Sequence, residues 1–152
     1  MKLRYKIASG FLVVLAVVVF SLAIVLSYDS GCDPAPAVAD DAELMKAIRY
    51  RCYGSTDVLE FEDVDKPTPS DNEVLAKVVA ASVNPLDWHY MRGSPYIMRL
   101  QAGLGAPKDS RMGVDFAGTV EAVGKDVTRF KAGDDVFGGR NGAFAEYVIV
   151  PE

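Results

Sequence analysis

The stretch GVDFAGTVEAVGKDV, residues 113–127, separates two fold classes, because its three glycines fit either a phosphate-binding loop or the bends of a β-sheet. A phosphate-binding loop needs Gly-x-Gly-x-x-Gly, or Gly-x-x-x-x-Gly followed by Lys and Ser or Thr, so that successive backbone amides converge on phosphate oxygens. Gly113 and Gly118 have the wider spacing, but Thr119 and Val120 stand in the places of the Lys and the hydroxyl residue. The run FAGTVEAVG is instead rich in β-branched and small residues, and it predicts a strand.

Short runs with strand-like patterning recur on both sides of this stretch. Turn signals separate them at intervals of about ten residues, which is typical of small all-β domains. Gly133, in KAGDDVF, is predicted to take a positive φ at a turn before a strand. The sequence therefore predicts a mainly β fold, a small β-barrel, with strands over 45–53, 58–64, 74–83, 116–124, 134–139 and 143–150, the first two forming a hairpin.

One helical segment interrupts this pattern, in NPLDWHYMRG. Asn84 is a favourable N-cap, and Gly93 suits the left-handed residue that follows a last turn, so a helix is predicted over 85–92. Asp87 and His89 point to nearly opposite sides of such a helix. We therefore expect Asp87 to stabilise the first turn rather than to orient His89.

The N-terminus predicts a single membrane-spanning helix. An uncharged apolar stretch, residues 7–26, is long enough to cross about 30 Å of hydrocarbon. The basic residues of 1–6 precede it and every acidic residue follows it, which favours a cytoplasmic basic tip and an exported body. A cleaved signal peptide, or a lipoprotein that uses Cys32, is the alternative. Residues 27–43, rich in Pro, Ala and Asp, are predicted to be a linker.

Composition narrows the class of protein further. The chain has 152 residues, half of them hydrophobic, which suits one core of ordinary size. Its net charge of −5, without a basic cluster outside the N-terminus, disfavours a nucleic-acid partner. Cys32 and Cys52 match no zinc-ligand spacing and are too few to predict a disulfide framework.

Four stretches, in this order, carry a resemblance to a known family: YGSTDVLEFEDVDKPTPSDNEVLAKV, ASVNPLDWHYMRG, GVDFAGTVEAVGKDVTRFKAGDDVFG and GAFAEYVIVPE. Residues 44–152 resemble the N-terminal GroES-like domain of the medium-chain dehydrogenase/reductase superfamily, particularly its zinc-free, quinone oxidoreductase-like branch. The resemblance implies a GroES-like barrel with one or two short helices. It also implies a substrate-side role beside a separate Rossmann domain that binds the nucleotide.

The resemblance implies that no metal is bound. Zinc-dependent relatives have a Cys ligand where this chain has Asn84, and a His-Glu pair where it has Val114 and Asp115. An amide and a valine do not replace a thiolate and an imidazole, so we expect no catalytic zinc. NAD(P)H is expected as cofactor only if a Rossmann domain is supplied. The expected protein partner is such a domain, in cis or in trans, or a further copy of the chain in a homo-oligomer.

By the same resemblance, the short helix and the residues near it line the active-site cleft. Hydride transfer to a carbonyl or a quinone places negative charge on the substrate oxygen, which protein donors stabilise. The catalytic candidates are His89, Tyr90 and Arg92; the substrate-binding candidates are Tyr53, Asn84 and Tyr96, with Asn84 also a candidate cofactor contact. Each has a purely structural alternative, such as the N-cap role of Asn84.

Three functions remain open from the sequence. The first is the substrate-side domain of a membrane-anchored, zinc-independent NAD(P)-dependent oxidoreductase for quinones, enones or carbonyls, inactive by itself. The second is a free-standing, non-catalytic GroES-like binding module, and the third is a ring-forming assembly module. The expected export of the barrel conflicts with a cytoplasmic nicotinamide supply, so the side of the membrane stays open.

Overall fold

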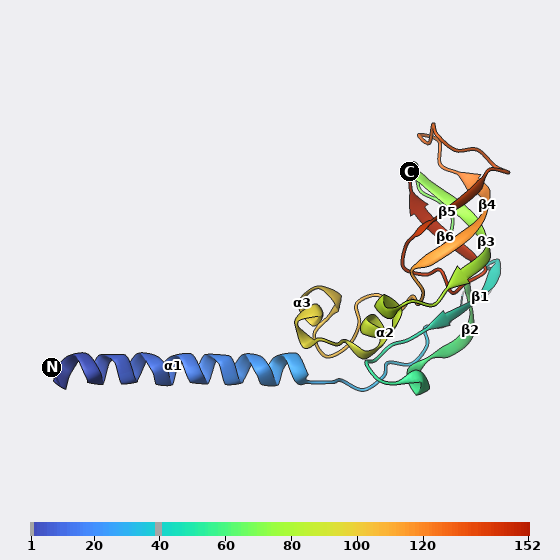
Figure 1. The fold of residues 1–152 in the computed structure, drawn as a ribbon. Helices are drawn as coiled ribbons and strands as arrows, with labels where there is room; N and C mark the ends of the chain where they lie inside the picture. Colours follow the sequence, from blue (N-terminus) through green and yellow to red (C-terminus); the bar gives the residue numbers. More distant parts are fainter. Residues whose placement is uncertain (1, 39–40) are drawn as a thin grey trace.

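A long N-terminal helix extends away from a β-rich body in the computed structural model, which describes residues 2–38 and 41–152 (Figure 1). This helix, α1, runs over Lys2–Ser27. The basic tip predicted as a separate segment, residues 1–6, is continuous with the helix from Lys2 onward, and Met1 lies outside the described residues. Helix-forming residues without Gly or Pro at this end give the backbone no reason to break.

Among the described residues, α1 is the one helix whose length and composition suit a membrane crossing, over Ser9–Ser27, and its side chains from Ser9 to Val25 are exposed. A signal sequence near an N-terminus has the same properties. The span over residues 7–26 therefore stays a prediction.

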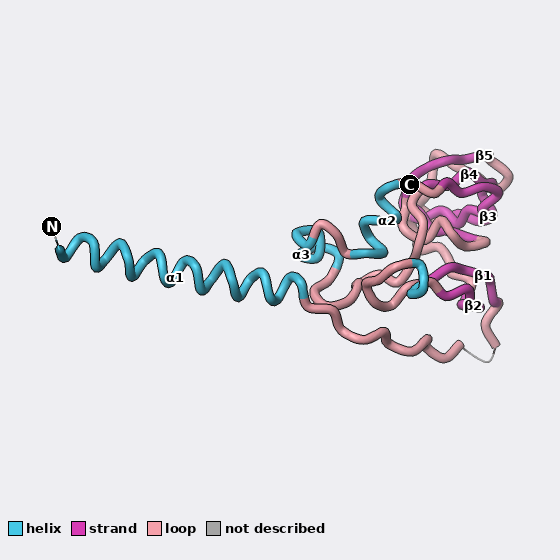
Figure 2. The backbone as a smooth tube through the Cα atoms, turned by 60° about the horizontal axis from the view of Figure 1, so that its bottom comes forward, coloured by secondary structure: helices cyan, strands magenta, loops and turns pink. Residues whose placement is uncertain are grey.

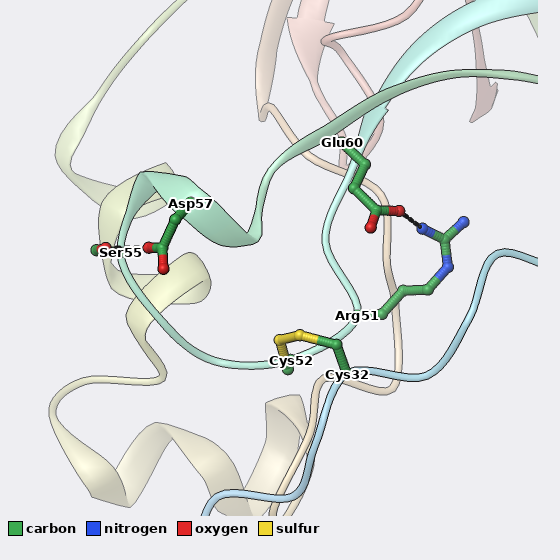
Figure 3. Close-up of a disulfide and its surroundings, with 6 residues drawn as sticks. All are labelled: Cys32, Arg51, Cys52, Ser55, Asp57 and Glu60. Atoms are coloured by element: carbon green, nitrogen blue, oxygen red, sulfur yellow. Dashed lines mark hydrogen bonds and ion pairs between the residues drawn. A yellow bond between two sulfur atoms is a disulfide. The ribbon is translucent and has the colours of Figure 1, made fainter.

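The segment that follows α1 is irregular, as the predicted linker would be, but it is attached to the body. The backbone N–H of Ser30 donates to the carbonyl of Gly105 at 2.9 Å, and Cys32 forms a disulfide with Cys52 (Figure 3). The cysteine count did not predict this bond, because the fold alone brings the two residues, 20 positions apart, to a Cα–Cα distance of 4.7 Å. Residues 39–40 of the linker lie outside the described residues.

The first two strands form the predicted hairpin. Strand β1, Leu44–Arg49, pairs antiparallel with β2, Glu60–Asp65, so that Leu44 lies opposite Asp65. A short 3-10 helix, η1 (Thr56–Val58), occupies the connection between them.

The remaining strands form a four-stranded antiparallel sheet in the order β5-β4-β3-β6. Its central strands match the predicted positions closely, and Gly133 has the predicted positive φ, 91°. The strand bounds are Glu73–Ser82 for β3, Asp115–Val123 for β4, Asp135–Gly139 for β5 and Tyr147–Pro151 for β6.

The mainly β part of the prediction is confirmed, but the described residues do not form a closed barrel. The two sheets stay separate, and isolated antiparallel bridges join β1 to the rest of the body at Ala47–Ala145 and Arg49–Arg111. The segment before β6 also explains why β6 begins at Tyr147 rather than at residue 143: Phe144 accepts from the N–H of Ile48. Closure needs continuous pairing around the whole circumference, and two isolated bridges do not provide it.

Three short helical elements lie between the sheets and the end of α1 (Figures 1 and 2). They are α2 (Pro85–Arg92), which has the predicted bounds, the 3-10 helix η2 (Tyr96–Met98) and α3 (Arg99–Ala102). One apolar cluster, which includes Phe116 and Val148, lies in the four-stranded sheet. A second cluster, Tyr50, Met91 and Met112, packs α2 against the body and so fixes the helix that carries the three predicted catalytic residues.

Candidate functional site

The N-terminus of α2 is held by a capping box. The side chain of Asn84 accepts from the N–H of Leu86 at 2.8 Å, and the Asp87 carboxylate accepts from the N–H of Asn84 at 2.8 Å. Gly93 ends the helix with a φ of 57°, in the left-handed region where a side chain is disfavoured. The prediction that Asp87 stabilises the first turn is confirmed.

Asp87 is buried, with 1% of its surface exposed. Burial raises the pKa of its carboxyl, and the nearby Asp115 raises it further, whereas the hydrogen bond from the Asn84 backbone lowers it. Its second oxygen, Oδ1, has no hydrogen-bond partner in the part of the chain that the structure describes. The charged form of Asp87 is therefore incompletely compensated.

Asn84 also joins α2 to the sheet. Its Nδ2 donates to Oδ2 of Asp115, at the start of β4, over 2.7 Å. Of the three positions that the resemblance compares with the zinc-dependent branch, Asn84 and Asp115 are thus in direct contact, as an amide and a carboxylate. The described residues contain no group of three or more His, Cys, Asp or Glu placed to hold a metal. That the protein works without zinc stays a prediction.

A buried arginine lies at the other end of this region. Arg99, 2% exposed, donates from Nε to the carbonyl of Gly93 at 2.9 Å. Its Nη1 donates to the carbonyls of Leu26 and Tyr28, at 3.1 and 3.0 Å, and forms an ion pair of 2.8 Å with Asp29. Arg99 therefore caps the C-terminal end of α1 and attaches it to the body.

Two tyrosine rings flank this guanidinium. The carbon Cζ of Arg99 lies 4.3 Å from the ring centre of Tyr53 and 4.7 Å from that of Tyr96, within the range of cation–π attraction. The Tyr53 hydroxyl donates to the carbonyl of Gly103 at 2.7 Å, and burial raises its pKa. The Tyr53 side chain is buried and held in place by this hydrogen bond, whereas Tyr96 is half exposed.

These residues surround an open pocket of about 380 Å³. It brings together three of the predicted site residues, Tyr53, Arg92 and Tyr96. Another hollow, of about 400 Å³ beside β5, contains none of them. The main side chains around the pocket are Asp29, Tyr53, Trp88, Arg92, Tyr96 and Arg99.

The pocket contains two side chains whose polar groups are uncommitted. Arg92 lies over the ring of Trp88 at 5.2 Å and is exposed. Among the described residues, neither its guanidinium nor the hydroxyl of Tyr96 makes a hydrogen bond or an ion pair, although the guanidinium of Arg99 lies over the Tyr96 ring. Both groups are free to donate to a bound oxygen.

The other predicted residues lie outside the pocket lining. Nδ1 of His89 lies 2.6 Å from the carbonyl oxygen of Ser94, and since a carbonyl only accepts, Nδ1 carries the proton of the neutral ring. Tyr90 packs against the cluster of Tyr50 and Met112. The proposed roles of His89, Tyr90 and Asn84 stay predictions.

Sequence reasoning missed Arg99 and Asp29. An isolated arginine in the apolar run YIMRLQ was the available signal, because a cation among apolar residues needs partners when it is buried. Its partners, however, lie as many as 73 positions away in the sequence.

The glycines of residues 113–127 do not form a dinucleotide site. A Cβ at Gly118 would lie 2.1 Å from the carbonyl oxygen of Lys77, and one at Gly124 would lie 2.0 Å from that of Ser70. Protein backbone fills the space that a phosphate would need. The described residues therefore do not fit a nicotinamide dinucleotide bound through this stretch.

Comparison with known proteins agrees with this fold. Residues 70–152 match the family model of the alcohol dehydrogenase GroES-like domain, and the chain belongs to this family. A chloroplastic quinone-oxidoreductase homolog of Spinacia oleracea is 39% identical over 116 residues, which are 73% of this chain and 34% of that protein. The resemblance to the quinone oxidoreductase-like branch is confirmed.

Solved structures give the same result. The quinone oxidoreductase of Coxiella burnetii superposes with a TM-score of 0.61 at 35% identity, over 72% of this chain and 35% of that one. The Escherichia coli quinone oxidoreductase, solved in complex with NADPH, gives 0.59 at 25% identity, over 70% and 31%. This chain spans about a third of the length of these relatives.

Proposed function

We propose that this chain is the substrate-side domain of a membrane-anchored, zinc-independent NAD(P)H-dependent oxidoreductase that reduces a quinone, an enone or another carbonyl compound. The observation that carries this function is the pocket in which Arg92 and Tyr96 present uncommitted donors beside the fixed ring of Tyr53. The names of the quinone oxidoreductase relatives support the substrate class.

The chemistry suits these groups. When a carbonyl or quinone is reduced, negative charge develops on its oxygen, and positioned donors stabilise that charge. A guanidinium and a phenol on one pocket wall are such donors, and the exposed face of Trp88 offers a surface for a flat ring. NAD(P)H would supply the hydride from a separate Rossmann unit, in cis or in trans, because backbone fills the space beside the glycines of residues 113–127.

Membrane anchoring is supported by α1 and by the charges around it. We assign residues 1–6 to a cytoplasmic tip, 7–26 to a single span, 27–43 to the connection and 44–152 to the domain. The disulfide Cys32–Cys52 favours an oxidising compartment for the body, in agreement with the positive-inside rule. Hydride supply from the cytoplasm would require the opposite side, so topology is the critical measurement for this function.

Substrate binding can be followed through Trp88, the single tryptophan of the chain. Titration of the full chain in detergent with a short-chain quinone should quench its fluorescence saturably. Arg92→Gln and Tyr96→Phe should each weaken the apparent affinity by about tenfold, the effect of one hydrogen bond of about 1.4 kcal/mol. Arg129→Gln is the matched control, because Arg129 also lies over an aromatic ring, that of Phe130, but outside the pocket.

Catalysis is tested by joining the chain to the cofactor domain of the NADPH-binding E. coli relative. Quinone-dependent oxidation of NADPH that falls in the Arg92→Gln variant is expected. Saturable quinone binding without NADPH oxidation would instead favour the non-catalytic binding module, and an absence of both would refute the proposed substrate site.

A further inference from the structure

A patch of exposed apolar side chains lies on the segment that contains η2 and α3. Ile97 is 61% exposed, and Leu100 and Leu104 are each 52% exposed. Tyr96 and Tyr28 extend this surface toward α1 with half or more of their surface exposed. We refer to Tyr28, Tyr96, Ile97, Leu100 and Leu104 as the juxtahelical patch.

The patch lies beside the C-terminal end of α1. Both views place α3 next to this end, whereas the strands lie on the far side of the body (Figures 1 and 2). Leu26, in the last turn of α1, is buried, although residues 9–25 before it are exposed. The body therefore meets α1 at the turn where the apolar stretch ends.

Several contacts fix this arrangement. The hydrogen bonds from Arg99 to the carbonyls of Leu26 and Tyr28 hold α3 against the helix end. On the other flank, the N–H of Ser30 donates to Gly105, at the end of the patch segment. A rigid connection means that the position of α1 determines what the patch faces.

We infer that the juxtahelical patch is a lipid-contacting surface, seated on the membrane interface around α1. This inference rests on the membrane anchoring contained in the proposed function. If α1 crosses the bilayer, its last apolar turn lies at the interface, and the patch lies at the same depth. Tyrosine rings and aliphatic side chains next to a span are typical of this layer, where a ring is solvated at one end and buried at the other.

Continuity with α1 separates this patch from other exposed apolar residues. Phe61, Val79 and Phe137 are more exposed, but they belong to the strands, on the side away from α1. Charged side chains beside the patch include Asp29, which is paired with Arg99, and the exposed cations Arg92 and Lys108.

Tyr96 belongs to both the patch and the pocket. Arg99 and Asp29 also line the pocket. A patch seated on lipid therefore places the pocket opening at the membrane surface. The ligand class that this geometry selects is an apolar acceptor dissolved in the bilayer, whose polar head reaches Arg92 while its tail stays in lipid.

The inference is tested with single-tryptophan variants of the full chain in phosphatidylcholine vesicles that carry bromine on the acyl chains. In a Trp88→Phe background, Leu100→Trp probes the patch and Phe137→Trp is the control on β5. Emission from position 100 should fall by about twofold or more while emission from position 137 is unchanged, because an interfacial apolar face lies roughly 5–10 Å into the headgroup and acyl boundary. Leu104→Trp is the second probe if the first variant does not fold.

Alkaline carbonate extraction of the same vesicles tests the membrane anchor separately from the lipid-contacting patch. Chain that stays in the membrane but shows equal quenching at positions 100 and 137 refutes the lipid-contacting patch and leaves the anchor intact. Chain that is extracted refutes the anchor, and the patch with it.

Discussion

The carboxylate of Asp29 lies 2.8 Å from Nη1 of Arg99, and this pair joins the end of the apolar helix to the wall of the pocket. The two partners differ in burial: the side chain of Arg99 is 2% exposed and that of Asp29 is 52% exposed. Removing one or the other therefore has different consequences, although the same ion pair is lost.

Arg99→Met should lower the free energy of unfolding by about 3–5 kcal/mol, because it removes a buried cation that also satisfies several carbonyls. Asp29→Asn should cost about 1 kcal/mol or less, since its carboxylate is half in water. Urea unfolding followed by circular dichroism measures both. Equal losses in the two variants would show that the ion pair, and not the carbonyl contacts, fixes α1.

The disulfide should contribute about 3 kcal/mol, the loop-closure value for its separation of 20 residues. We expect a reductant to lower the unfolding midpoint of the parent chain accordingly. The Cys32→Ser/Cys52→Ser double variant should start at that lower midpoint and show no response to reductant. A response in the double variant would mean that the reductant acts elsewhere.

Gly93→Ala should destabilise the protein by more than the strain of its left-handed backbone. A Cβ at Gly93 would lie 2.7 Å from both the Tyr53 ring and Nε of Arg99. Gly133→Ala is the matched control, because Gly133 also has a positive φ, 91°, but nothing lies within 4 Å of its Cβ position. We expect about 1 kcal/mol of loss at Gly133 from backbone strain and clearly more at Gly93. Thermal unfolding of the two variants measures both losses of stability. Equal losses would show that the Tyr53 ring and Arg99 do not crowd a side chain at Gly93.

The buried carboxyl of Asp87 should make the folding stability depend on pH. Its carboxyl pKa is raised in the folded state, so stability is lost as pH rises from the unfolded value, about 3.9, through the folded value. Asp87→Asn keeps an acceptor for the Asn84 N–H without this titration. The stability of the Asn variant relative to the parent should therefore increase across that pH range and then level off. Urea midpoints from mildly acidic to neutral pH measure this, and a difference that falls with pH would reverse our sign.

The Cys32–Cys52 disulfide allows a measurement of which side of the membrane the body occupies. In intact cells that express the full chain, an impermeant maleimide should label the chain only after an impermeant reductant is added, because both cysteines are paired and Cys32 is at the surface. This is the result expected for an exported body. Labelling that requires permeabilised cells, and no reductant, would place the body in the cytoplasm, where thiols stay reduced and nicotinamide cofactors are present.

Much of the fold could be predicted because local sequence patterns specify its elements. The α2 bounds follow from the Asn84 cap and the Gly93 terminator, and the central strands follow from alternation between glycine bends. Of the six site residues that the family resemblance predicted, Tyr53, Arg92 and Tyr96 lie around one pocket, and their roles stay predictions. The family resemblance, carried by motifs in order along the chain, was confirmed by comparison.

The sequence by itself determined the apolar helix, the β-rich body and the capped turn, because propensity, periodicity and capping act between residues a few positions apart. Only the tertiary structure decided that the sheets remain separate, that Cys32 meets Cys52 and that Arg99 binds Leu26 and Asp29. These contacts join residues from 20 to 73 positions apart. Their formation depends on where the packed elements place each side chain, and no local pattern encodes that distance.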